Sequence, residues 1–244
     1  MNRLFILLVF CSAVLMETAI AQRSEKYDGE YADFYRAEEL FEKEQYSAAR
    51  KTFELFLSQL TDPNDPMHQK ARYYEGLSAL NLYTNNAIEL LTCFNLDYPE
   101  NIHKNEIYFK IGQNYYQSKK YVDATEWFER TNLSQIDTAF HAEYYFKKGY
   151  AHFQLGETSE ARNALFEVKN GNTKYAAPAT YYFSHIAYQN ESYQVALEGF
   201  NKLKNDPTFE KEVPYFITQI YYLQGDFESV IKYAPDTSGD IKDK

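Results

Sequence analysis

The chain of 244 residues lacks most of the features on which enzymes and disulfide-bonded proteins depend. It has two cysteines, nine glycines and one tryptophan. No motif for a phosphate-binding loop, a dinucleotide fold, a zinc protease or a paired-cysteine site occurs. His141 and His152 share a helix face but lie about 16 Å apart at 1.5 Å per residue, too far to hold one metal ion. We therefore predict no enzyme, no cofactor and no metal, and ordinary surface or groove positions for all five histidines: His68, His103, His141, His152 and His185.

Basic charge and long apolar runs are also scarce. The net charge of −10 is spread along the chain, so no surface would neutralise phosphates, and we expect no nucleic acid partner. The same charge disfavours an anionic membrane surface. After residue 21 no apolar stretch approaches eighteen residues, so we predict no membrane span.

The first 21 residues predict export. Arg3 precedes an apolar run from Leu4 to Leu15, and Ala19-Ile20-Ala21 follows it. This is the pattern of a secretory signal peptide with its cleavage site, and the run is too short to span a bilayer. The mature chain is therefore expected to begin at Gln22 and to be exported, in the periplasm or associated with the outer membrane.

Neither cysteine is expected to carry chemistry. Cys11 lies inside the signal peptide, and Leu8-Val9-Phe10 before it lacks the small residue that precedes a lipidated cysteine. Cleavage then leaves Cys93 alone, so no internal disulfide can form. We predict that Cys93 is a small buried filler.

What the chain has in abundance is aromatic residues and an internal repeat. There are 24 tyrosines and 18 phenylalanines. Six segments of similar sequence align on one residue each, here called the anchor, and successive anchors are 38, 37, 37, 35 and 34 residues apart. A period near 34 residues predicts a helical repeat. The anchors are Ala49, Ala87, Ala124, Ala161, Ala196 and Val230.

Other positions repeat with the anchors. A large apolar residue follows four positions later in five copies: Phe53, Leu91, Phe128, Leu165 and Phe200. A small residue lies twelve positions before the anchor in five copies: Ala37, Gly112, Gly149, Ser184 and Thr218. In the second copy Gly76 is one residue out of step, which a loop shortened by one residue would explain.

These positions resemble the tetratricopeptide repeat, a helix-turn-helix unit with a small residue and a tyrosine in its first helix and A-x-x-x-F in its second. The third copy matches best, at Tyr108, Ile111, Gly112, Tyr115, Tyr121, Ala124 and Phe128. The resemblance implies an all-α fold, a right-handed α-solenoid of about six repeats over residues 30–234, after a linker at 22–29 and before a polar tail at 235–244. The expected helix pairs are 30–43 with 46–60, 67–82 with 85–97, 104–118 with 121–132, 138–155 with 158–170, 177–190 with 193–204, and 211–224 with 227–234.

The repeat gives a reason for glycine within a helix, where it costs about 1 kcal/mol relative to alanine. We expect the paired helices to approach most closely at Gly112 and Ala124, and Gly76 and Gly149 to serve the same purpose. Tyr115, Tyr121 and Phe128 are predicted to fill the wedge between the two helices.

The first helices also carry an aromatic stripe. It consists of the residues fifteen and eight positions before each anchor, or fourteen and seven before Ala87 in the shifted second copy. Eleven of the twelve are aromatic. In the family that this chain resembles, first helices line a concave ligand-binding face. The stripe is therefore either packing between helices or an aromatic groove for a peptide, and a tyrosine can serve both. The aromatic members are Phe34, Phe41, Tyr73, Phe109, Tyr116, Phe146, Phe153, Tyr181, Tyr188, Tyr215 and Tyr222, and Leu80 is the exception.

Two functions follow from these observations. The first is a scaffold of the cell envelope that binds a protein or peptide, and the second is an accessory module that binds peptidoglycan or another glycan on stacked tyrosines. The basic clamp for a carboxylate that the family often uses is disfavoured, because aromatic residues occupy its positions. Val230 and Ile231 of the last helix would have little cover, so we also expect further repeats or another chain against that end.

Overall fold

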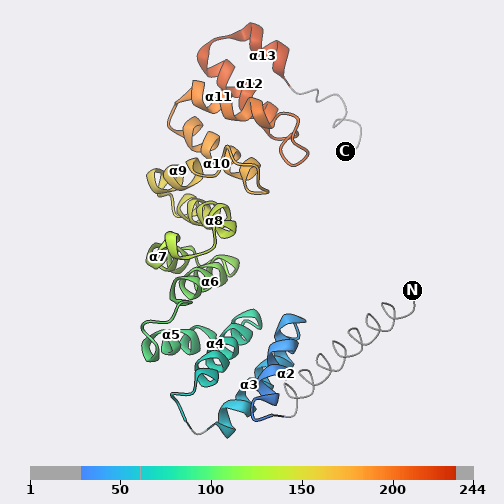
Figure 1. Ribbon diagram of the computed structural model, residues 1–244. Helices are drawn as coiled ribbons and strands as arrows, with labels where there is room; N and C mark the ends of the chain where they lie inside the picture. Colours follow the sequence, from blue (N-terminus) through green and yellow to red (C-terminus); the bar gives the residue numbers. More distant parts are fainter. Residues whose placement is uncertain (1–28, 61, 235–244) are drawn as a thin grey trace, which may run out of the picture. The chain divides into compact units, whose positions relative to one another are not determined.

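The computed structural model describes residues 29–60 and 62–234, and all its regular structure is helical (Figure 1). Within these residues there are twelve α-helices, two 3₁₀ turns and no strand. The chain divides into two compact units at residues 104 and 105, and each unit is described by itself. The predicted signal peptide, nearly all of the linker and the polar tail fall outside the described residues.

Unit 1 contains two helical hairpins. Each consists of two helices that pack against each other, and α3 also packs on α4. Asp65 caps α4 by accepting a hydrogen bond from the backbone N–H of Met67 (2.7 Å), and Pro66 takes the first helical position, where no N–H is needed. The helices are α2 (Ala32–Glu42), α3 (Tyr46–Gln59), α4 (Pro66–Asn81) and α5 (Ala87–Asp97).

Unit 2 contains four more hairpins. In Figure 1 the first helices α6 and α8 lie to the right of their partners α7 and α9. The bounds match the predicted ones to within three residues, except that α9 ends four residues early, because residues 167–170 form turns. The helices are α6 (Lys104–Gln117), α7 (Tyr121–Arg130), α8 (His141–Gln154), α9 (Thr158–Phe166), α10 (Ala176–Gln189), α11 (Tyr193–Leu203), α12 (Val213–Gln224) and α13 (Phe227–Tyr233).

The turn within every hairpin has the same backbone conformation. One residue adopts a positive φ, and the next N–H donates to a carbonyl five residues earlier, as Lys120 does to Tyr115 (2.9 Å). This is a Schellman-type helix end. The left-handed residue lies five positions before the anchor in five copies and four before Ala87, so the shortened loop of the second copy is confirmed. These residues are Glu44, Tyr83, Lys119, Gly156, Glu191 and Gly225.

The repeat positions form the core of each hairpin. All five alanine anchors and all five large residues four positions later are buried. Gly112 does make room, but for a side chain: a Cβ there would lie 2.7 Å from two ring atoms of Phe128. Gly149 faces Leu165 and Gly76 faces Leu91 in the same way.

In the fifth hairpin the small residue is on the other helix. Ser184 takes the position of the glycines in α10 and is buried. Gly199 of α11 faces it, and a Cβ there would lie 1.9 Å from the Ser184 hydroxyl oxygen. Close approach is therefore preserved although the first helix has gained a side chain.

Several predicted positions need correction. Phe128 fills the wedge, but Tyr115 is only half-buried, and Tyr121 lies against the rings of Tyr116 and Tyr150 on first helices. Cys93 is exposed, because it lies on the outer side of α5, and is no buried filler. His152 is buried, where a surface or groove position was expected.

The last helix is poorly covered within the described residues. Val230 is half-buried where every alanine anchor is enclosed, and Ile231 is 82% exposed. This agrees with the low cover expected from the sequence.

Candidate interaction surface

Unit 1 has a cleft of about 460 Å³ beside its first helices. Its apolar part comes from Tyr73 and Tyr74 of α4 and Phe94 of α5, and its polar rim includes Glu38 of α2 and Lys70 of α4. The remaining wall is the connection that follows α5, residues 100–103. The cleft therefore joins aromatic rings to charges of both signs.

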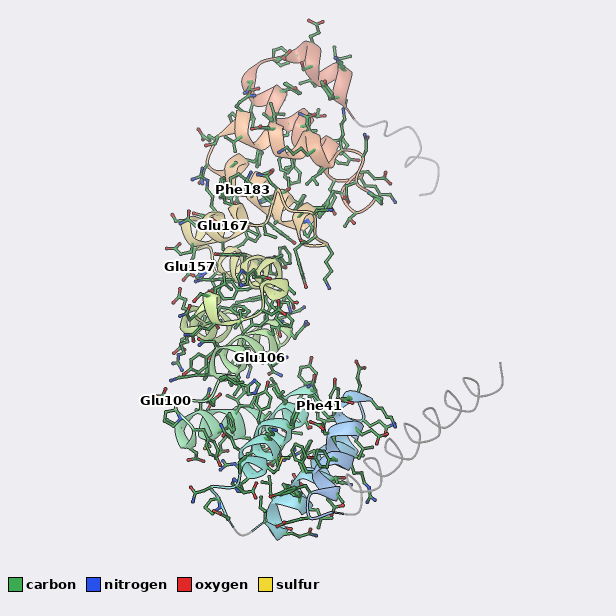
Figure 2. The ribbon with its side chains drawn as sticks, in the orientation of Figure 1. Phe41, Glu100, Glu106, Glu157, Glu167 and Phe183 are labelled. Atoms are coloured by element: carbon green, nitrogen blue, oxygen red, sulfur yellow. The ribbon has the colours of Figure 1, made fainter. Side chains whose placement is uncertain are left out.

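The predicted stripe contributes unequally to unit 1. Phe34 is 1% exposed and belongs to the core of the first hairpin. Tyr73 is also buried, but the small part of its side chain that remains accessible forms part of the cleft wall. Phe41, labelled in Figure 2, is half-buried between the rings of Tyr46 and Tyr74. In unit 1 the stripe residues therefore do not form an exposed groove, and Tyr73 alone among those named here lines one side of the cleft.

In unit 2 the half-buried rings of successive first helices touch. Tyr150 of α8 is 5.8 Å from Tyr116 of α6 and 4.9 Å from Tyr182 of α10, both measured between ring centroids. Phe153 lies 5.0 Å from Tyr182. We call nine of the half-buried rings on α6, α8, α10 and α12 the aromatic surface: Tyr116, Phe146, Tyr150, Phe153, Tyr181, Tyr182, His185, Tyr188 and Phe216.

The aromatic surface continues from α10 to α12. Phe216 lies 5.4 Å from the ring of His185 and 5.6 Å from that of Tyr188. Burial lowers the pKa of His185, and its Nδ1 is buried without a hydrogen-bond partner in the part of the chain described. The ring is therefore neutral at pH 7 and acts mainly as a flat apolar group.

A ring from the connection to the next hairpin covers the residue fifteen before the anchor in four copies. Such connection rings were not foreseen from the sequence. The closest pairs are parallel: Tyr73 with His103 at 4.0 Å and Tyr181 with Phe209 at 4.7 Å. The other two connection rings are Phe140, on Phe109 at 5.7 Å, and Tyr175, on Phe146 at 5.4 Å.

The stripe in unit 2 therefore ranges from core to open surface. Phe109 is 1% exposed, so it lines no groove, because Phe128, Phe140 and Tyr144 enclose it. The stripe members on α8 and α10, and Tyr116 on α6, belong to the aromatic surface. Tyr215 and Tyr222 of α12 are 52% and 63% exposed.

Tyrosine hydroxyls of the aromatic surface, and of the connection ring Tyr175 beside it, give this face its polar character. Burial, and then the carboxylate of Glu143, raise the pKa of Tyr175 to about 12. Burial and Glu212 do the same for Tyr181, whose hydroxyl donates to Glu212 over 3.2 Å. Burial also raises the pKa of Tyr182, so all three remain neutral hydrogen-bond donors at pH 7.

The charges on this face are paired internally. Burial alone would raise the pKa of Glu143, but hydrogen bonds and the charge of Lys147 outweigh it and lower the pKa. Gln113 also donates to Glu143 over 2.7 Å. The ammonium of Lys147 is thus held by Glu143 and lies 5.5 Å from the ring centroid of Tyr116, which leaves it poorly placed to clamp a ligand carboxylate.

Four residues of the aromatic surface are not members of the predicted stripe: Tyr150, Tyr182, His185 and Phe216. Tyr150 and His185 follow Phe146 and Tyr181 by four residues, one helical turn, so the same-face rule could have found them. Tyr182 and Phe216 lie fourteen before their anchors, at the flank of the stripe. No periodic signal separates them from core positions.

Within the described residues, no group of three or more His, Cys, Asp or Glu could hold a metal ion. No helix among them combines the length and apolar character needed to cross a membrane.

The comparisons with known proteins show the fold. No family model matches the chain, and no curated protein sequence matches it. Similar solved structures include the C-terminal part of a TPR repeat-containing protein from Cytophaga hutchinsonii, 16% identical with a TM-score of 0.62 over 94% of this chain and 93% of that one. A tetratricopeptide repeat protein from Parabacteroides merdae is 12% identical, with a TM-score of 0.57 over 84% and 77%. MamA of AMB-1 is 18% identical, with a TM-score of 0.56 over 72% and 91%. The predicted fold class, an all-α tetratricopeptide-repeat solenoid, is confirmed.

Proposed function

We propose that this protein is a non-catalytic scaffold of the cell envelope, and that its aromatic surface binds a partner protein or peptide. The observation that carries the proposal is the ring contact across helices, from Tyr116 through Tyr150 to Tyr182, on a face that remains half-open. Half-buried tyrosines combine apolar contact with hydroxyl donors and are enriched at binding hot spots.

Ring geometry favours a peptide over a glycan. A sugar stacks on the free face of a ring, but Tyr150 meets Tyr116 and Tyr182 edge to face, at 65° and 72°. The edge of one ring therefore covers part of the next ring's face. The half-exposed rings suit the side chains of a peptide, and peptidoglycan or another glycan is the second candidate.

A capture experiment tests the proposal. Immobilised residues 22–244 would be exposed to envelope extract, beside the double variant Phe153→Ala/Tyr188→Ala and the control Phe166→Ala. Phe166 is also aromatic and is exposed, but it lies on α9, away from the aromatic surface. We expect the native chain and Phe166→Ala to retain the same partner and the double variant to lose it.

Circular dichroism of all three proteins controls for folding. Retention of the partner by the folded double variant would contradict the proposal. A glycan array probed with the same proteins separates the two candidates, because binding to the array with no protein captured would favour the glycan.

Export is a separate part of the proposal. Its support is the pattern of residues 1–21, and the scaffold would then act in the periplasm or at the outer membrane through a partner. Mass spectrometry of the protein from fractionated cells should find a mature chain that begins at Gln22. Uncleaved protein in the cytosol would contradict export without affecting the aromatic surface.

A further inference from the structure

A second cleft, of about 380 Å³, lies in unit 2 between α7, α8 and α9. It uses a different face of α8 from the aromatic surface: Tyr144, Lys148 and His152 follow one another at intervals of four residues and line it. Glu129 of α7, Glu160 of α9 and Glu167, which directly follows α9, complete its polar wall. Figure 2 shows Glu157 and Glu167 on the α9 side of this unit.

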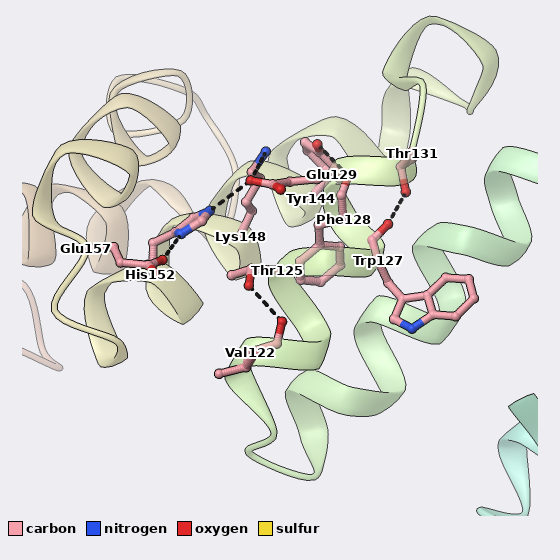
Figure 3. Close-up of polar contacts among 10 residues, drawn as sticks. All are labelled: Val122, Thr125, Trp127, Phe128, Glu129, Thr131, Tyr144, Lys148, His152 and Glu157. Carbon is pink, nitrogen blue, oxygen red and sulfur yellow. Dashed lines mark hydrogen bonds and ion pairs between the residues drawn. The ribbon is translucent and has the colours of Figure 1, made fainter.

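His152 is the unusual residue of this cleft. It is 3% exposed, and its Nδ1 lies 2.6 Å from Oε2 of Glu157 (Figure 3). In the neutral tautomer that carries its proton on Nδ1, this contact is a hydrogen bond and Nε2 is an acceptor. Nε2 is buried with no hydrogen-bond partner in the described part of the chain, and it faces Oε1 of Glu129 at 4.0 Å. In that tautomer Nε2 and the carboxylate oxygen are both acceptors.

The cleft also carries more negative than positive charge. Glu129, Glu160 and Glu167 supply three carboxylates, and Lys148 supplies one ammonium, 3.9 Å from Glu129. Neither Glu160 nor Glu167 has an ion-pair partner among residues 29–60 and 62–234. The cleft therefore attracts a cation, and its acceptors require one that donates hydrogen bonds.

The walls set the shape of that cation. The ring of Tyr144 and the methyl group of Ala164 give the cleft an apolar lining, on which the methylenes of a long side chain can lie while its charged end meets the carboxylates. Guanidinium has five N–H donors in one plane and loses less hydration than ammonium. It can serve Nε2 of His152 and the carboxylate of Glu129 together once Glu129, whose side chain is 59% exposed, moves aside.

We propose that this cleft binds an arginine side chain of a partner protein. The site is independent of the aromatic surface, so either can fail without the other. A partner that carries an arginine-containing segment would contact the second-helix side of unit 2 by charge and hydrogen bonding, whereas the first-helix side offers rings.

The probe is the capped peptide acetyl-Gly-Arg-Gly-amide, and its match is the same peptide with citrulline, which keeps the shape and loses the charge. Binding to residues 22–244 would be followed through the ¹⁵N resonances of the histidine rings. We expect the His152 ring to respond with a dissociation constant of about 1 mM and the citrulline peptide to bind at least about tenfold more weakly. Added salt should weaken the arginine peptide only.

Variants of the exposed carboxylates test the assignment without disturbing the core. Glu160→Gln/Glu167→Gln should weaken the arginine peptide about tenfold, and the control Glu89→Gln, an exposed carboxylate of α5, should leave it unchanged. Equal binding of the arginine and citrulline peptides, or no change in the double variant, would overturn the proposal. A lysine peptide that binds as tightly as the arginine peptide would overturn the choice of arginine.

Discussion

The first three hairpins and the last three treat the same repeat position differently. Fifteen residues before the anchor, Phe34 and Phe109 are enclosed in the core, and Tyr73, at the shifted position fourteen before Ala87, is nearly so. At the equivalent position Phe146 and Tyr181 are half-buried, and Tyr215 is mostly exposed. All six residues are aromatic, so the repeat pattern alone does not separate core from surface.

The difference lies in what the second helix offers. Phe34 contacts Phe53 and Phe56 of α3, four and seven residues after the anchor. In the fourth hairpin Leu165 of α9 and Val168 of the following turn take those positions, and Phe146 contacts no ring of α9 in the described structure. Its ring instead lies against Tyr150 and Tyr175 on the first-helix side. In this pair of hairpins, aromatic residues on the second helix accompany a buried ring and aliphatic ones a half-buried ring. Tyr181 departs from this, because it contacts Phe200 of α11 and is still half-buried.

The largest expected effect on stability comes from truncating equivalent rings to alanine in the two groups of hairpins. Phe109→Ala should lower the free energy of unfolding by about 3–5 kcal/mol, because it empties an enclosed site. Phe146→Ala should cost about 1–2 kcal/mol, since part of its ring already faces solvent. Urea unfolding of both variants measures the difference, and equal costs would show that the two positions are energetically alike.

The next effect concerns the stability lost when the helix glycines at positions 112 and 149 are replaced by alanine. Alanine at position 112 or 149 would gain about 1 kcal/mol of helix propensity, but its Cβ would meet Phe128 at 2.7 Å or Leu165 at 2.8 Å. We expect net losses of about 1–3 kcal/mol from Gly112→Ala and Gly149→Ala. The loss at 149 should be larger, because the Cβ there also meets the backbone nitrogen of Leu165 at 3.1 Å. A rise in melting temperature in either variant would disprove close packing at that hairpin.

Within one hairpin, Tyr115 and Phe128 test whether truncating a half-buried ring costs about half as much stability as truncating a fully buried one. The sequence predicted that both fill the wedge between the helices, which implies similar losses on truncation, whereas the structure leaves Tyr115 partly exposed. Tyr115→Ala should cost about 1–2 kcal/mol and Phe128→Ala about 3–5 kcal/mol. Thermal melts at matched concentration decide this, and a Tyr115 variant as unstable as the Phe128 variant would restore the original prediction.

The smallest effect concerns the turns, which are alike in all hairpins. Lys119 has φ 57°, a conformation that costs a side-chain-bearing residue about 1 kcal/mol. Lys119→Gly should therefore stabilise the protein by up to about 1 kcal/mol, less the entropy that glycine adds to the unfolded chain. Gly156→Ala, at the equivalent turn with φ 76°, should destabilise it by about 1 kcal/mol. Changes of the same sign in the two variants would mean that the turns are not equivalent.

Sequence reasoning predicted the hairpins well because the anchors report on helix crossing. Ala124 and Phe128 repeat with little variation, and a residue enclosed between two helices tolerates few alternatives. The shortened second loop could be inferred because Gly76 was displaced by one residue relative to Ala87. Such signals are local and repeat six times.

The candidate surfaces were less predictable, because they depend on contacts between repeats. Nothing in the stripe indicates that Phe140 would cover Phe109 or that Phe209 would cover Tyr181, since the connections have no period. The buried His152 and its cleft likewise arise from side chains of three helices. Predicting these features requires knowledge of how side chains from different helices pack, which the periodic sequence pattern does not contain.

The connection rings have a consequence for cooperativity. Phe140 precedes α8 and packs on Phe109 of the hairpin before it. In the same way, Phe209 precedes α12 and packs on Tyr181 of the hairpin before it. Opening one hairpin therefore uncovers a ring of its predecessor, and neighbouring hairpins in unit 2 are coupled in the nearest-neighbour sense that governs repeat arrays. Tyr215 has no such ring among the described residues, so the amides of α12 and α13 should exchange with solvent first and those of α8 and α10 last.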